Sequence, residues 1–131
     1  MSQPVMLYAA LSALLLVGLS ARVIQGRIVF KIDIGDGGNE DMKRRIRVQA
    51  NFIEYVPLAL ILMLFLQQAG FSTWIVHLLG VTLILARVLH ATGLGRFSGA
   101  SKGRFIGATA TFAVLLVGAV LSLLGAFGVH F

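Results

Sequence analysis

Four long apolar stretches constrain this chain more than any other feature of its sequence. A helix that crosses the hydrocarbon core of a bilayer needs about 20 mostly apolar residues, and four segments meet or approach that length. These predicted spans cover residues 4–21, 46–68, 74–93 and 105–127. They are continuously apolar and lack the alternation that is typical of membrane β-strands. The sequence therefore predicts an all-α integral membrane protein, a bundle of four transmembrane helices that forms one domain over residues 1–131.

The charged residues indicate how these spans are oriented. They make up only 12% of the chain, about half of the share that is usual in soluble domains. The basic residues are concentrated in two predicted loops, 22–45 and 94–104, whereas the turn at 67–73 carries no charge. Because basic loops tend to remain in the cytoplasm, we expect both loops there and both termini on the opposite side. Topology accounts for these basic residues, so they do not indicate a nucleic-acid partner.

The chain contains no cysteine. This absence excludes disulfides, cysteine-ligated metals and a cysteine nucleophile. Any thiol chemistry must therefore use the sulfur atom of a ligand. No further histidine or aspartate clusters with His90 in the sequence, so we also expect no metal site.

Polar residues inside the second predicted span are candidate functional residues, because ionisable groups are costly in a membrane. Arg47, Asn51 and Glu54 fall within about 60° of one another around a helix, and Tyr55 flanks this stripe. Gln49 points about 160° away from Asn51, so we expect it to face a different neighbour. The second span therefore presents one polar face and one separate polar residue.

The third and fourth predicted spans add further cations. Arg87 and His90 are three residues apart, so they share one helix face, and Arg104 begins the fourth span. One carboxylate, Glu54, cannot neutralise three arginines, and unmatched buried guanidinium groups are costly. The surplus of positive charge therefore points to an anionic ligand. Arginines suit carboxylates and Glu54 suits an ammonium group, so a small zwitterion with an extra carboxylate fits the balance.

A purely structural role for these charges is the alternative. Glu54 could pair with Arg47 or Arg87 in an internal ion pair that holds the helices together.

The sequence also contains a pattern that is typical of close helix packing. Gly99, Gly103 and Gly107 are spaced four residues apart at the start of the fourth span. Small residues at this spacing permit close contact between membrane helices.

Two motifs and one loop resemble those of a known family. The segment Arg-Val-Gln-Ala-Asn-Phe-Ile-Glu-Tyr-Val-Pro at residues 47–57 resembles the second-helix signature of the MAPEG family, the membrane-associated proteins of eicosanoid and glutathione metabolism. The run from Arg87 to His90 resembles the third-helix motif of that family. The glycine-rich loop at residues 35–39 is similar to that of its small bacterial members. Within the family, the second-helix segment most resembles leukotriene C synthase, and the chain also resembles microsomal glutathione transferase.

The resemblance implies a homotrimer of four-helix subunits in the bacterial inner membrane, with glutathione as a co-substrate. The implied glutathione-binding residues are Arg47, Asn51, Glu54, Tyr55, Arg87 and His90 of one subunit, and Arg22 and Gln49 of the neighbouring subunit. Arg104 resembles the arginine that stabilises the thiolate, and Lys102 is its alternative. A neighbouring guanidinium lowers the pKa of a thiol and so enriches the nucleophilic thiolate. The implied activity is that of a glutathione transferase or peroxidase, which acts on a lipophilic electrophile or a lipid hydroperoxide from the membrane lipid.

Two other functions compete with this interpretation. A small proton-coupled multidrug transporter would also have four spans and one membrane carboxylate, although the arginines around Glu54 would repel a cationic drug. A non-catalytic membrane scaffold of the same fold is the second alternative. It is suggested by Leu94, where the eicosanoid enzymes of the family carry a tyrosine.

Overall fold

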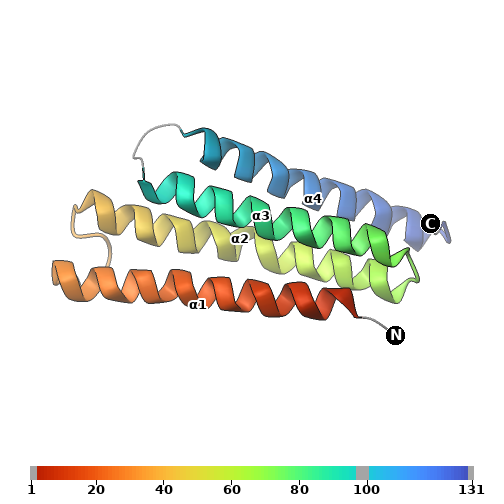
Figure 1. Cartoon of the computed structure of the whole chain (residues 1–131), viewed down its shortest axis with the longest axis horizontal. Coiled ribbons are helices and arrows are strands. Elements are labelled where there is room, and N and C mark those ends of the chain that lie inside the picture. The colour runs from red at the N-terminus through yellow and green to blue at the C-terminus, as the bar shows by residue number, and fades with distance from the viewer. Residues whose placement is uncertain (1–2, 97–100, 130–131) are drawn as a thin grey trace.

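The protein is an up-and-down bundle of four helices in a computed structural model that describes residues 3–96 and 101–129 (Figure 1). The helices are α1 (Pro4–Phe30), α2 (Glu40–Gln68), α3 (Thr73–Arg96) and α4 (Lys102–Ala126). Each of them is long and apolar enough to cross a membrane. The predicted all-α fold, with four helices that are each able to span a membrane, is therefore confirmed.

The basic segments of the sequence meet at one end of the bundle. The connection between α1 and α2 lies at the same end as the C-terminal end of α3 and the N-terminal end of α4 (Figure 1). We call this end, with residues 22–47 and 101–104, the basic end. The opposite end holds the start of α1, the turn between α2 and α3 and the end of α4, and we call it the neutral end.

Two helices extend beyond the predicted apolar spans toward the basic end. Helix α1 continues to Phe30, and α2 already begins at Glu40, so the predicted loop 22–45 is helical except at residues 31–39. Local capping sets these ends. The left-handed backbone of Lys31 closes α1, and the side chain of Asn39 accepts a hydrogen bond of 2.9 Å from the backbone N–H of Met42. Apolar length predicts where the bilayer lies, whereas caps decide where a helix stops.

Helices α2 and α3 together form the centre of the bundle. Each of them packs against the three other helices, whereas α1 and α4 share no packing contact within the described part of the chain. The buried residues in the middle of α2 recur every three or four positions, as expected for a helix with one packed face. They are Phe52, Val56, Ala59, Met63 and Leu66. The outer surface is apolar as well, as a lipid-facing surface requires, with Leu14 69% and Leu116 66% exposed.

Helices α3 and α4 approach each other closely near the basic end. A Cβ atom at Gly107 would lie 2.5 Å from the carbonyl oxygen of Ala86 and 2.6 Å from the backbone nitrogen of His90. Gly103 also faces the backbone of α3. The predicted close approach is confirmed at Gly103 and Gly107, whereas Gly99 and the side chain of Leu94 lie outside the described residues.

This contact predicts that Gly107→Ala destabilises the protein. The added methyl group would meet backbone atoms that cannot yield, so we expect the free energy of unfolding to fall by about 1–3 kcal/mol. Gly18→Ala is the matched control, because a Cβ there has nothing within 4 Å and alanine favours a helix by up to about 1 kcal/mol. Unfolding in detergent micelles, followed by circular dichroism, measures both variants. Equal stability of the two would contradict the close contact.

Candidate functional site

A cavity of about 450 Å³ lies near the basic end, where side chains of α2, α3 and the start of α4 converge. Its lining residues are Arg47, Asn51, His90, Ser101, Arg104, Phe105 and Ala108. Four of them were predicted as site residues from the sequence, namely Arg47, Asn51, His90 and Arg104. The fold therefore brings together residues that are up to 57 positions apart in the chain, from Arg47 to Arg104.

Helix geometry and capping position these side chains. Arg47 and Asn51 are one helical turn apart on α2, and the close contact between α3 and α4 brings His90 beside α4. The hydroxyl of Ser101 caps α4 by accepting a hydrogen bond of 3.1 Å from the backbone N–H of Arg104. Ser101 was not predicted as a site residue, although a serine three residues before Arg104 at the start of an apolar run is an N-cap signal.

Arg87 lies behind the cavity and not on its surface. Its side chain is only 2% exposed. Nη2 donates a hydrogen bond of 2.7 Å to Oδ1 of Asn51 and lies 3.3 Å from Nδ1 of His90. Nη1 donates to the hydroxyl of Thr111 at 3.4 Å, and the guanidinium carbon lies 5.8 Å from the centre of the Phe52 ring. None of these partners is a carboxylate, and two of them, Asn51 and His90, line the cavity.

Glu54 and Tyr55 are near the cavity on α2 but do not belong to its lining. Oε1 of Glu54 lies 3.7 Å from Nη1 of Arg47, and both side chains are about half exposed. Because both residues are on α2, this pair joins no two helices, and exposed pairs contribute only about 0–1 kcal/mol. The predicted pair of Glu54 with Arg47 is therefore present, but within this chain it does not hold two helices together. Tyr55 packs edge-on against Phe112 of α4, with ring centroids 5.3 Å apart.

Gln49 and Arg22 lie away from the cavity within this chain. The amide nitrogen of Gln49 donates a hydrogen bond of 2.7 Å to the hydroxyl of Ser20 on α1. Arg22 is exposed on α1, and its backbone carbonyl accepts a hydrogen bond of 2.8 Å from Arg45. The expectation that Gln49 faces a different neighbour from Asn51 is confirmed. The contribution of Gln49 and Arg22 to a neighbouring subunit's site stays a prediction.

Arg104 and Lys102 line different hollows. Arg104 lines the cavity described above, whereas Lys102 lines a second hollow of about 420 Å³ together with Ser101, Phe105 and Ile106. Ser101 and Phe105 belong to both linings, so the two hollows adjoin. Of the two candidate cations for the thiolate, Arg104 is therefore the one that shares a cavity with Arg47 and Asn51.

Positive charge dominates the cavity. Two guanidinium groups line it and that of Arg87 lies behind it, and no carboxylate is part of the lining in the described portion of the chain. Within residues 3–96 and 101–129, no group of three or more histidine, aspartate or glutamate side chains is placed to hold a metal ion. The arrangement suits an anionic ligand that accepts hydrogen bonds.

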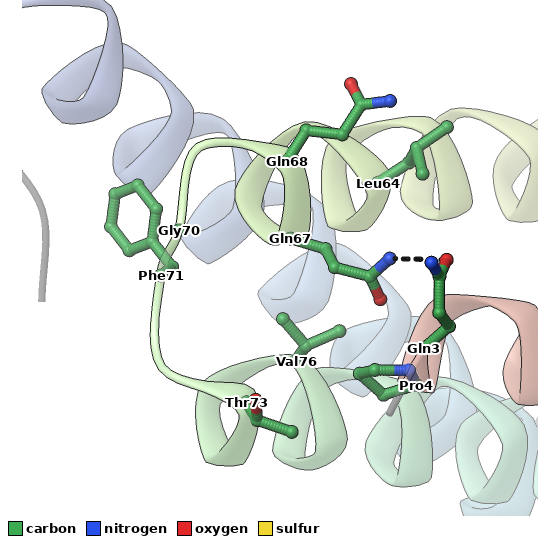
Figure 2. Close-up of a pocket in the computed structure, with 9 residues that line it drawn as sticks. All are labelled: Gln3, Pro4, Leu64, Gln67, Gln68, Gly70, Phe71, Thr73 and Val76. Atoms are coloured by element: carbon green, nitrogen blue, oxygen red, sulfur yellow. Dashed lines mark hydrogen bonds between the residues drawn. The ribbon is translucent and has the colours of Figure 1, made fainter. Parts of the chain in front are cut away.

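A larger cavity, of about 620 Å³, lies at the neutral end (Figure 2). Its lining residues are Gln3, Pro4, Leu64, Gln67, Gln68, Gly70, Phe71, Thr73 and Val76. Gln67 donates a hydrogen bond of 3.3 Å to Gln3 and accepts one of 3.1 Å from the backbone N–H of Val5, which fastens the start of α1 to the end of α2. Among the described residues, this lining offers no ionisable side chain for proton transfer or for binding an ion. The cavity at the basic end is therefore the candidate functional site.

Comparisons with known proteins agree with this architecture. The sequence profile of the MAPEG family matches residues 5–124, which reach from α1 into α4. The chain is 42% identical over 87 residues to the inner membrane protein YecN of Escherichia coli strain K12, a match that covers 66% of each protein. YecN of Escherichia coli O6:H1 strain CFT073 gives the same identity and coverage. The chain thus spans about two thirds of the length of these relatives, and its match to the family profile covers nearly its whole length. This chain belongs to the MAPEG family of membrane proteins.

Proposed function

We propose that this protein is a membrane-bound glutathione transferase that binds glutathione in the cavity at the basic end. The observation that carries the proposal is the lining, in which Arg47 and Arg104 accompany Asn51 and His90 and which contains no carboxylate among the described residues. Glutathione carries two carboxylates and one ammonium group, so a donor-rich, positively charged cavity suits it. A volume of about 450 Å³ lies within the usual range of ligand pockets, about 300–1,000 Å³.

The proposed binding mode assigns each charged group of glutathione a partner. Arg47 and Asn51 would hold a carboxylate, because a guanidinium and an amide N–H both donate hydrogen bonds. Glu54, which lies 3.7 Å from Arg47 at the edge of the cavity, would bind the ammonium group, with Tyr55 beside it. His90 would donate a further hydrogen bond to the ligand.

In this proposal Arg104 is the catalytic residue. Its guanidinium would face the thiol and lower the thiol pKa from its usual value of about 8.5. The thiol proton is released to solvent, the thiolate sulfur forms a bond to an electrophilic carbon, and the leaving group departs with the electrons of its bond to that carbon. A lipid hydroperoxide is the other substrate class. Two equivalents of glutathione would reduce it to an alcohol and water and would themselves be oxidised to glutathione disulfide.

The second substrate would come from the bilayer. The hollow beside the cavity is lined by Phe105 and Ile106 and shares Ser101 and Phe105 with the cavity itself. A lipophilic electrophile could therefore reach the sulfur atom along α4 without crossing water. This route favours an enzyme that acts on membrane-soluble compounds.

We also propose that the protein works as a homotrimer in the bacterial inner membrane, with the basic end in the cytoplasm. Glu54 lies eight residues inside the predicted apolar span that begins at residue 46, about 12 Å along the helix, yet its side chain is 46% exposed. An exposed carboxylate at this depth is costly in lipid. A neighbouring subunit would cover it, and Arg22, exposed on α1, would supply a cation from that neighbour.

The competing functions make different use of the same residues. A proton-coupled transporter requires Glu54 to exchange a proton for a cationic substrate, but Arg47 lies next to this carboxylate and would repel such a substrate. A non-catalytic scaffold requires no activated thiol. Glutathione-dependent thiolate formation therefore separates the enzyme from both alternatives.

Arg104→Ala should abolish activation of the thiol while glutathione remains bound. Removing a nearby positive charge raises the pKa of the bound thiol by about 1–3, so the thiolate fraction at neutral pH falls at least about tenfold. Ultraviolet absorbance of the thiolate during titration of the detergent-solubilised protein measures this fraction, and calorimetry measures binding. Lys102→Ala is the matched control and should keep the thiolate signal.

Each outcome of this titration has a defined meaning. Loss of the thiolate signal in Lys102→Ala but not in Arg104→Ala would mean that Lys102, and not Arg104, is the catalytic residue. Binding of glutathione without a thiolate signal in the wild type would favour the scaffold. If the wild type does not bind glutathione, the proposed function is wrong, and proton-coupled uptake of cationic drugs would be the next assay.

The trimer proposal predicts a specific mass. Native mass spectrometry from a non-ionic detergent should give three times the 14.0 kDa of one chain, because the exposed Glu54 and Arg47 require cover from neighbours. A predominantly single-chain species under conditions that preserve glutathione binding would contradict the proposed trimer.

A further inference from the structure

Arg87 is buried at 2% exposure, and in the described part of the protein it reaches the cavity only through other side chains. We infer that Arg87 is a positioning residue that makes Asn51 and His90 present hydrogen-bond donors to the cavity. The inference rests on the proposed function, since it assigns Arg87 a role in selecting the anionic ligand without contact with it.

The contact with His90 fixes the protonation of the imidazole ring. A guanidinium has only N–H donors and remains charged in proteins. Nδ1 of His90, 3.3 Å from Nη2 of Arg87, must therefore be the unprotonated acceptor. A neutral imidazole with a free lone pair on Nδ1 carries its proton on Nε2. Because His90 lines the cavity, the polar atom left for a ligand there is a donor, Nε2–H.

The contact between Arg87 and Asn51 likewise leaves a hydrogen-bond donor for the cavity. Oδ1 of Asn51 accepts the 2.7 Å hydrogen bond from Arg87, because a guanidinium cannot accept one. This leaves the amide nitrogen of Asn51, with two hydrogens, for the cavity that the residue lines. A reversed amide would instead present an oxygen, which repels a carboxylate.

Thr111 and Gly107 hold the guanidinium in this orientation. The hydroxyl of Thr111 donates a hydrogen bond of 2.8 Å to the carbonyl oxygen of Gly107, so its lone pair is free to accept from Nη1 of Arg87 at 3.4 Å. Arg87 therefore connects to α4 through Thr111 and to α2 through Asn51, and its own helix α3 supplies His90. One buried cation sets the hydrogen-bonding direction of two cavity residues on two helices.

Nitrogen NMR of ¹⁵N-histidine-labelled protein without glutathione tests the positioning directly, and His90→Gln identifies the His90 signals. The wild type should contain the Nε2–H tautomer alone. Arg87→Met removes the donor while keeping an unbranched side chain, so His90 should become a mixture of tautomers. Arg87→Lys retains a donor and should keep the Nε2–H form. An Nδ1–H tautomer in the wild type, or an unchanged single tautomer in Arg87→Met, would overturn the inference.

A double-mutant cycle measures the consequence for the ligand. Arg87→Met should weaken glutathione binding about tenfold in the wild-type background, as expected for two impaired hydrogen bonds. In a background of Asn51→Ala with His90→Ala, the same change should cost less than about twofold, because the groups through which Arg87 acts are gone. An equal loss in both backgrounds would mean direct contact with glutathione and would contradict the inference. Circular dichroism and gel filtration identify variants that fail to fold, and the Arg87→Lys comparison then decides the question.

The two experiments separate failure of this inference from failure of the proposed function. Glutathione binding by the wild type together with a tautomer that does not depend on Arg87 would overturn the positioning role alone. An Arg87-dependent tautomer in a protein that does not bind glutathione would contradict the proposed function, and with it the role of these donors in binding that ligand.

Discussion

A guanidinium group in an apolar helical bundle needs acceptors around it, and this requirement organises the basic end of the molecule. Arg87 lies in the spanning part of α3 at 2% exposure. Its acceptors come from each of the helices that meet there, namely Asn51 of α2, His90 of α3 and Thr111 of α4. Because unsatisfied donors cost several kcal/mol in a membrane, the bonds of Nη2 to Asn51 and of Nη1 to Thr111 favour one arrangement of α2 and α4 against α3. Nε of Arg87 has no hydrogen-bond partner among the described residues. The close contact at Gly107 makes this geometry sterically possible.

The same arrangement gives the two ends of the bundle different chemistry. At the neutral end, amide side chains such as Gln67 and Gln3 satisfy one another and fasten α1 to α2. At the basic end, Arg47 and Arg104 line a cavity without a carboxylate in the described residues, and the charge they bring is left for a ligand. Attraction for an anionic thiol compound and stabilisation of its thiolate would then come from one set of cations.

Much of this architecture could be predicted from the sequence, because it depends on simple physical quantities. Apolar length predicted four spans, and helical periodicity placed Arg47 and Asn51 on one face and Gln49 on another. The ends of α1 and α2 could not be predicted from apolar length, because the caps at Lys31 and Asn39 determine them.

The arrangement of the site could be predicted only in part. Periodicity assigns Arg87 to a face of α3, but it does not reveal whether the side chain lines a cavity or lies behind one. That distinction depends on how closely α3 and α4 pack, and therefore on Gly107. Hydropathy does not distinguish a buried position from a lipid-facing one either, because lipid-facing and core residues of the bundle are equally apolar. Periodicity does predict that Glu54 and Arg47 share a face of α2, where they form a pair, but it does not reveal that the buried Arg87 bonds to Asn51 of the same helix.

We propose above that glutathione binds in the cavity at the basic end with its sulfur atom next to Arg104. Solid-state NMR can test it with glutathione carrying ¹³C at the cysteine methylene and protein carrying ¹⁵N in its arginine side chains. Dipolar dephasing of that carbon by arginine nitrogen, with a carbon shift of thiolate character, is the predicted result. The dephasing should disappear in Arg104→Ala, although glutathione still binds. Dephasing that persists in Arg104→Ala, or bound glutathione without any arginine coupling, would contradict the claim.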